Sequence, residues 1–184
     1  MSVKIIKEFM LKNNLTAQSD VNEVMKLVEI TKMYKNEKGI YEITMKGPKN
    51  SYYEGGIYDI TIDMENNNKG RPEIRILQKI YHLNVSPNGH VSGYFINQWE
   101  KNFTIIHALI GIYLYLKLCQ NPFDPYDGKM AFEYQSNIKE FERKARLWTL
   151  QYATGKNPQN EIKIIIEIKK KCEKAFFYQK KLMK

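Results

Sequence analysis

The chain has 184 residues and carries 29 Lys and Arg against 20 Asp and Glu, a formal net charge of +9. This length is typical of one domain with an appendage, and it allows a core that needs no disulfide or metal support. Two cysteines and three histidines without paired spacing exclude a disulfide scaffold and give no reason to expect a metal or other cofactor. Hydrophobic residues make up 43% of the sequence, which excludes a largely disordered chain.

No export signal or membrane span is expected. The first residues, MSVKIIKEFMLKNN, lack the continuous apolar region of a signal peptide. The longest near-apolar run, residues 105–116, is much shorter than the roughly 20 residues that cross a bilayer, so it predicts a buried core helix. We therefore expect an intracellular protein, cytoplasmic and/or nuclear.

The positive charge is concentrated near the C-terminus. Residues 155–184 contain nine Lys and three Glu. A segment of this kind is either a solvated helix face or a contact surface for an acidic partner. The chain has four Arg against 25 Lys, and specific base readout relies on the Arg fork, so no specific nucleic acid is expected as a partner.

The first half of the chain predicts a helix followed by a sheet. Residues 1–18 are expected to form an N-terminal extension or a short helix, and Ser19 or Asp20 can cap the helix that follows. Beyond Gly39 the apolar period changes to two, which predicts strands at about 41–46, 58–64 and 73–76. Closely spaced strands with short turns are typical of an antiparallel meander, here of about four strands.

The second half predicts a long loop and then helices. The chain is irregular for about 25 residues after Leu77, and long loops in compact domains are usually functional. Helices are expected at about 103–118, 128–135 and 138–152, and a last amphipathic helix carries an apolar stripe from Ile162 to Phe176. The order predicts an α+β protein with a domain at 19–154 and a basic helical extension at 155–184.

Five segments, in this order, resemble landmarks of the ubiquitin-conjugating enzyme (UBC) family. They are GPKNSYYEGGIYDITI, IYHLNVSPNGHVS, NQW, NPFDP and FERKARLWTLQYA, within residues 19–154. The resemblance implies a UBC-like fold: an N-terminal helix, a four-stranded antiparallel meander sheet, a long active-site loop and C-terminal helices. The turn, the NPFDPYDG stretch and the INQ-W context look closest to the histone-ubiquitinating branch.

By this resemblance, Ser92 stands where the family has its catalytic cysteine, ten positions after His82. A thiol suits thioester transfer because its pKa of about 8.5 leaves useful thiolate near neutrality and makes it a good leaving group. A serine hydroxyl has neither property without a general base. His82 and His90 are the nearest candidates for such a base, although His82 matches a family histidine read as structural.

The resemblance also implies roles for Asn84 and Asp124. Asn84 matches the asparagine thought to stabilise the developing oxyanion, and the alternative is that its amide braces the loop through the backbone. Asp124 matches the acidic gate that orients and deprotonates the incoming lysine, and the alternative is a turn cap before Pro125. The implied catalytic positions are thus Ser92, Asn84 and Asp124.

Other matching positions are expected to be structural. Tyr53 and Trp99 are expected to pack, and Cys119 is expected to be a small core residue rather than a displaced nucleophile.

Several departures from the family pattern surround the site. Leu83 replaces the usual proline, which should loosen the loop, and Gly93-Tyr94 replace Leu-Asp. These coupled changes favour a natural serine over one introduced at position 92. The loop ENNNKGRP lacks the usual aromatic residue and residues 100–102 replace Ser-Pro-Ala, so docking of a ligase in the usual way is not expected.

Three functions are consistent with the sequence. The favoured one is a catalytically inactive relative of the conjugating enzymes that binds ubiquitin or a ubiquitin-like protein, an active conjugating enzyme or a ligase. The second is an active conjugating enzyme whose cysteine was replaced by Ser92. The third is an adaptor or scaffold that binds an acidic partner through residues 155–184.

Overall fold

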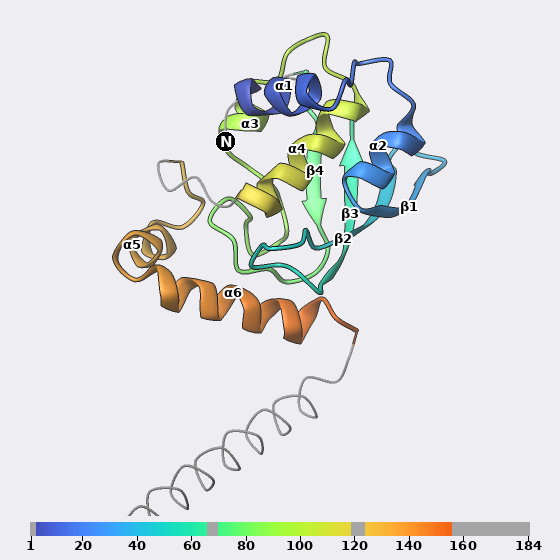
Figure 1. Ribbon diagram of the computed structural model, residues 1–184. Helices are drawn as coiled ribbons and strands as arrows, with labels where there is room; N and C mark the ends of the chain where they lie inside the picture. The colour runs from blue at the N-terminus through green and yellow to red at the C-terminus, as the bar shows by residue number, and fades with distance from the viewer. Residues whose placement is uncertain (1–2, 66–69, 119–123, 156–184) are drawn as a thin grey trace, which may run out of the picture. The chain divides into compact units, whose positions relative to one another are not determined.

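The computed structural model describes residues 3–65, 70–118 and 124–155, and residues Met1–Thr154 form one compact unit (Figure 1). The order of elements matches the helix, meander, long loop and helices expected from the sequence. In chain order they are α1 (Val3–Lys12), α2 (Val21–Leu27), β1 (Ile30–Lys35), β2 (Tyr41–Lys46), β3 (Ile57–Asp63), β4 (Glu73–Ile76), α3 (Tyr94–Asn97), α4 (Ile105–Leu118), α5 (Gly128–Ser136) and α6 (Ile138–Tyr152).

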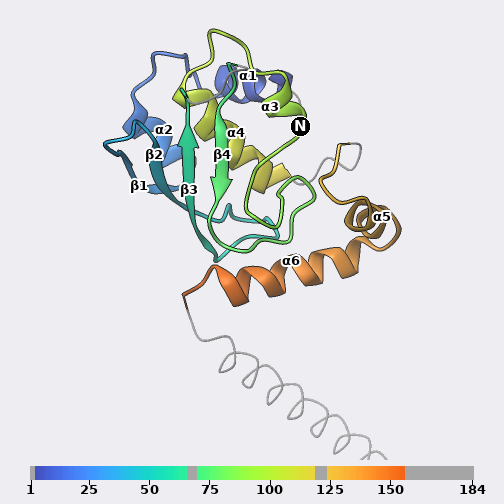
Figure 2. The ribbon, with the colours of Figure 1, turned by 180° about the vertical axis from the view of Figure 1, so that it is seen from behind.

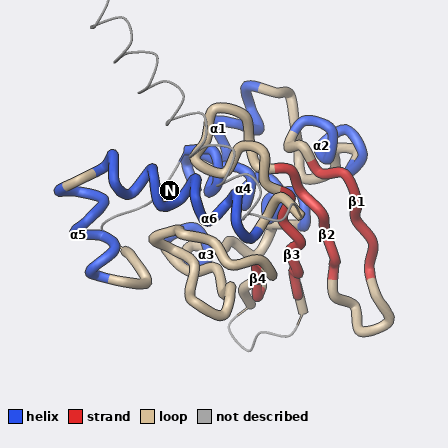
Figure 3. The backbone as a smooth tube through the Cα atoms, turned by 90° about the horizontal axis from the view of Figure 1, so that it is seen from below, coloured by secondary structure: helices blue, strands red, loops and turns tan. Residues whose placement is uncertain are grey.

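The four strands form one antiparallel sheet in the order β1-β2-β3-β4, and Figure 3 shows them side by side. The period-two pattern places alternate residues of β2, β3 and β4 in the core. These buried residues are Ile43, Met45, Tyr58, Ile60, Ile62, Ile74 and Ile76. The expected meander is confirmed.

Helix α4 covers one face of the sheet, as the opposite views in Figures 1 and 2 show. Ten of its 14 residues are buried, so the apolar run is the core helix that its length and composition predicted. In the view from behind, the strands lie in front of α4, and none of the described helices covers their outer face (Figure 2).

The N-terminal residues belong to the same compact unit as the domain that was expected to begin at residue 19. Helix α1 packs on α4 and buries Ile6 and Met10 in the core. Helix α2 begins at an Asp20 cap, whose carboxylate accepts the Asn22 N–H at 2.6 Å. Such caps satisfy N–H groups that have no partner within the helix.

Helices α5 and α6 follow at one end of the sheet. Asp127 and Asn137 cap them, and α6 buries Phe141, Ala145 and Thr149. The Tyr58 hydroxyl of β3 lies 2.9 Å from Thr149 Oγ1, and the Ile57 N–H donates to Ala153 O at 2.7 Å. These bonds attach the end of α6 to the start of β3.

Two predicted features lie outside the described residues: Cys119, and the amphipathic stripe from Ile162 to Phe176. None of the helices that the structure describes has the length and apolarity to cross a bilayer.

Candidate active site

The long loop between β4 and α3 carries the predicted site, and backbone hydrogen bonds tie it to the sheet. Val85 and Val91 form an isolated antiparallel bridge. The Val91 N–H donates to Ile74 O of β4 at 2.9 Å. Ser92, the next residue, is therefore held beside the edge of the sheet.

The structure brings the three predicted site residues together. The Ser92 N–H donates to Asn84 O at 2.9 Å, and Ser92 Oγ lies 3.4 Å from the same carbonyl oxygen. The Asn84 side-chain amide donates to the backbone oxygen of Asp124 at 2.6 Å. The amide thus braces the loop through the backbone, which is one of the two alternatives that the sequence left open.

His82 belongs to the same loop, and both of its ring nitrogens are engaged. Nδ1 accepts the Asn84 N–H at 3.0 Å, which leaves Nε2 as the nitrogen that donates to Tyr115 O at 3.2 Å. The ring is buried between Tyr53 and Tyr115, with centroids 5.6 and 5.5 Å away. Burial lowers the pKa of His82 to about 4 although the Tyr115 carbonyl raises it, so the imidazole is neutral. It is not placed to be the base for Ser92, because both ring nitrogens are already hydrogen-bonded elsewhere.

The second histidine candidate, His90, pairs with Arg75 in an isolated bridge, and its backbone N–H donates to Ser86 Oγ at 2.9 Å. Among the residues that the structure describes, neither imidazole is hydrogen-bonded to the Ser92 hydroxyl. Neither histidine is therefore placed as a general base for this serine.

Tyr115 of α4 is a site residue that sequence reasoning missed. Its hydroxyl donates to Ser92 O at 2.8 Å. Burial, and then the charge of Asp124, raises the pKa of the Tyr115 phenol, so the hydroxyl stays protonated and remains a donor. Its position 23 residues after Ser92, within an apolar run, gave no signal of this contact.

Known proteins of related sequence and fold identify the family of this chain. The sequence profile of the ubiquitin-conjugating enzymes matches residues 5–149. The chain belongs to the ubiquitin-conjugating enzyme family. It is similar to the E2 domain of a Toxoplasma gondii ubiquitin-conjugating enzyme, with 25% identity and a TM-score of 0.60 over 72% of this chain and 93% of that one. A Plasmodium yoelii structure assigned to the ubiquitin-conjugating enzymes matches with 28% identity and a TM-score of 0.61, over 76% and 94%.

Within this UBC fold, Leu83 stands where the resemblance expects proline, and it anchors the loop rather than loosening it as expected. Its side chain is fully buried, and its carbonyl accepts the Tyr126 N–H at 2.6 Å. Tyr53 is also buried, and its hydroxyl donates to Tyr81 O at 2.9 Å. Trp99 packs edge-on against a phenylalanine ring, with the centroids 5.2 Å apart.

The two segments in which the sequence departs from the family's ligase-docking pattern make contacts within the chain. Glu100 accepts two hydrogen bonds from Lys7 Nζ of α1, at 2.7 and 3.0 Å. Arg71 donates to Asn97 Oδ1 at 2.9 Å and so joins the loop before β4 to α3. Any ligase that docks here has to break or accommodate these bonds.

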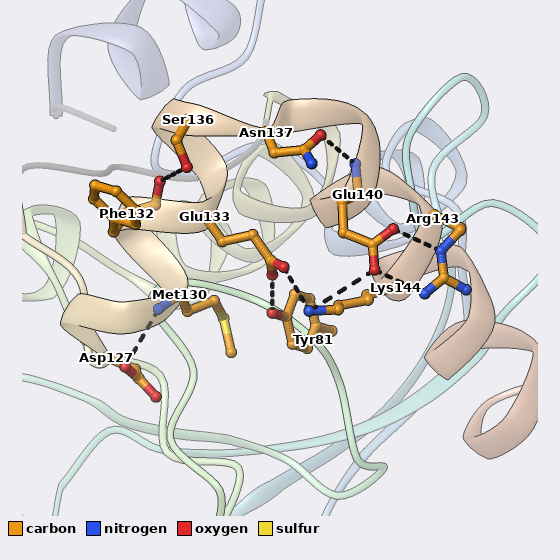
Figure 4. A network of polar contacts seen from close by, with 10 residues as sticks. All are labelled: Tyr81, Asp127, Met130, Phe132, Glu133, Ser136, Asn137, Glu140, Arg143 and Lys144. Atoms are coloured by element: carbon orange, nitrogen blue, oxygen red, sulfur yellow. Dashed lines mark hydrogen bonds and ion pairs between the residues drawn. The ribbon is translucent and has the colours of Figure 1, made fainter.

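A polar network joins the start of the active-site loop to the C-terminal helices, and Figure 4 shows it between α5 and α6. Glu133 of α5 accepts hydrogen bonds from the Tyr81 hydroxyl and from Lys144 Nζ of α6. Burial alone would raise the pKa of the Glu133 carboxyl, but these two hydrogen bonds outweigh it and lower the pKa. The network lines an open pocket of about 260 Å³.

The described residues contain no group of three or more His, Cys, Asp or Glu side chains placed to hold a metal ion.

Proposed function

We propose that this member of the ubiquitin-conjugating enzyme family forms no thioester and works by binding. Its partner is ubiquitin or a ubiquitin-like protein, an active conjugating enzyme, or a ligase. The observation that carries the proposal is residue 92 itself. A serine stands at the position of the family cysteine, its hydroxyl lies 3.4 Å from the Asn84 carbonyl oxygen, and both nitrogens of the nearby His82 are engaged elsewhere.

Chemistry supports this reading of Ser92. An alcohol is far less acidic than a thiol, so it needs a general base to become a nucleophile. The base that the sequence offered is neutral, but it cannot accept the serine proton because Nδ1 already accepts an N–H and Nε2 carries the proton. Asn84 and Asp124 remain beside the site, joined by the hydrogen bond from the Asn84 amide to the Asp124 backbone oxygen.

The direct test is a charging assay with an activating enzyme, ATP and ubiquitin; the resemblance to the histone-ubiquitinating branch makes ubiquitin the first modifier to try. We expect no thioester on the natural chain and at most a slow oxyester that resists reductant. The Ser92→Cys protein should charge weakly or not at all. Gly93-Tyr94 replace the family's Leu-Asp directly after residue 92, so the introduced thiol should be misplaced, and a misplacement of about 1 Å can cost about 100-fold in rate.

Rapid charging of Ser92→Cys on reducing and non-reducing gels would contradict this proposal. That result would favour the second function, an active conjugating enzyme in which serine had replaced cysteine at position 92. The natural coding sequence at codon 92 distinguishes the two directly. Binding itself is measured by titrating isotope-labelled ubiquitin with the natural chain, and we expect saturable shifts.

A further inference from the structure

The residue after Ser92 has no side chain, and a buried phenol lies where one would be. Gly93 has φ +113°, in the region that side chains rarely adopt. A Cβ atom built on Gly93 would lie 2.4 Å from the Tyr115 hydroxyl oxygen, closer than real Cβ contacts allow. Asn84 Nδ2 and Asp124 Oδ2 would be next, at 3.5 and 3.6 Å, which is ordinary contact. The one severe conflict is therefore with Tyr115.

The Tyr115 hydroxyl cannot easily move away from this position. The ring is buried, and it stacks on His82 with an interplanar angle of 10°. The hydroxyl also donates to Ser92 O at 2.8 Å. Moving it aside would break both contacts and leave the Ser92 carbonyl without this donor.

Both backbone polar groups of Ser92 are thereby held. The N–H donates to Asn84 O at 2.9 Å, and the carbonyl accepts from Tyr115. The side-chain Oγ lies 3.4 Å from the same Asn84 oxygen. These two backbone hydrogen bonds fix residue 92, and its hydroxyl lies on the Asn84 side.

We propose that Tyr115 is a positioning residue for residue 92 and that it forms a packed pair with Gly93, in which the phenol needs the absence of a side chain at position 93. The phenol occupies the volume that a side chain at position 93, leucine in the family pattern, would need. Its hydroxyl also holds the Ser92 backbone. The inference rests on the proposed function and deepens it. Besides the missing thiol, it adds that Tyr115 fixes the backbone of residue 92 in its present position, which would keep the site inactive.

A double-mutant cycle tests the pair. Gly93→Ala should lower the melting temperature of the natural chain, and it should lower it less in a Tyr115→Phe background, where the clashing oxygen is gone. Gly55→Ala is the matched control, because Gly55 has φ +85° but no atom within 4 Å of a built Cβ. Its cost should be the same in both backgrounds. Equal costs of Gly93→Ala in the two backgrounds would overturn the pair.

A second measurement tests positioning, and it remains informative if Gly93→Ala does not fold. In Ser92→Cys protein, the rate of alkylation of Cys at position 92 by iodoacetamide is followed by peptide mass spectrometry, which separates it from Cys119 and Cys172. Adding Tyr115→Phe should raise this rate about fivefold, because losing one hydrogen bond favours local opening of the loop. Adding Tyr113→Phe, on the same helix with its ring against Phe9, should leave the rate unchanged.

Equal alkylation rates in the Tyr115→Phe and Tyr113→Phe backgrounds would overturn the positioning role. Neither measurement involves ubiquitin, so the two proposals fail separately. Rapid charging of Ser92→Cys would overturn the proposed function and leave the pair standing. Additive melting temperatures and equal alkylation rates would overturn the pair and leave the proposed function standing.

Discussion

At residue 92, serine and cysteine differ by one atom, yet the consequences reach the backbone. The smaller, harder oxygen loses the thiolate chemistry that thioester transfer needs. Its neighbour Gly93 has no side chain where the resemblance expects leucine, and the Tyr115 hydroxyl lies in that space and donates to the Ser92 carbonyl. A serine introduced into an otherwise active site would not bring a glycine at position 93 with it. Gly93 is therefore consistent with the proposal that the thiol was lost naturally.

His82 makes the folded state sensitive to acid. Its pKa falls from 6.5 to about 4 on burial, so between these values the unfolded chain binds a proton that the folded chain does not. Unfolding is therefore favoured progressively as the pH drops from about 6.5 toward 4, by about 3 kcal/mol in total. Urea titrations at pH 7, 6 and 5 measure this loss.

The matched variants are His82→Gln and His107→Gln. His82→Gln should be less stable than the natural chain at pH 7 but should show a shallower pH dependence. Burial also lowers the pKa of His107, but the charge of Glu100 opposes this shift, so His107→Gln should change the slope in the same direction, by less. Parallel pH profiles for the natural chain and His82→Gln would contradict the prediction.

At the scale of elements, the helices and strands with a clear hydrophobic period were predicted from the sequence, and those without one were missed. Strands β2, β3 and β4 follow a period of two, and α6 follows helical spacing, so all four were predictable. Strand β1 was missed because only Ile30 of its six residues is buried, as befits an edge strand. Helix α3 was missed because it has only four residues.

The site divides in the same way. Ser92, Asn84 and Asp124 could be proposed because motifs mark them, and the bracing role of Asn84 was one of two stated alternatives. Its acceptor, the Asp124 carbonyl, is 40 residues away and depends on tertiary packing. Tyr115 could not be selected, because α4 is buried over most of its surface and its apolar pattern does not show which ring meets the loop.

The Tyr81–Glu133–Lys144 network makes a prediction about α5. Glu133→Gln should lower the free energy of unfolding by about 1 kcal/mol, because it removes a charge that accepts two hydrogen bonds at a partly buried site. Hydrogen exchange of residues 128–136 should rise more than that of the sheet. Glu142→Gln, which breaks an exposed pair with Arg146 on α6, should change neither quantity appreciably. Equal effects of the two variants would argue against the network.

At the scale of the whole molecule, two-thirds of the net positive charge lies in residues 155–184. The remaining +3 is spread over the first 154 residues, where charged side chains of the described part form ion pairs such as Lys7–Glu100 and Lys144–Glu133. This charge distribution favours an acidic partner for the C-terminal segment and does not require that the UBC domain bind an acidic partner. The adaptor alternative rests on this charge distribution: residues 155–184 would bind the acidic partner.

The adaptor alternative predicts how binding depends on salt. On a heparin column, the full chain should elute at clearly higher salt than a chain ending at Thr154, because the shortened chain has lost nine lysines. Salt weakens both interactions, since charges are screened over roughly 10 Å at 0.1 M salt. Replacing Lys169, Lys170 and Lys171 by Gln should produce an intermediate elution without removing the segment. The same order should hold for binding to an acidic protein partner, with a steeper salt dependence for the full chain. If the two chain lengths bind such a partner equally at low salt, the basic segment does not mediate the contact, and the UBC domain itself must.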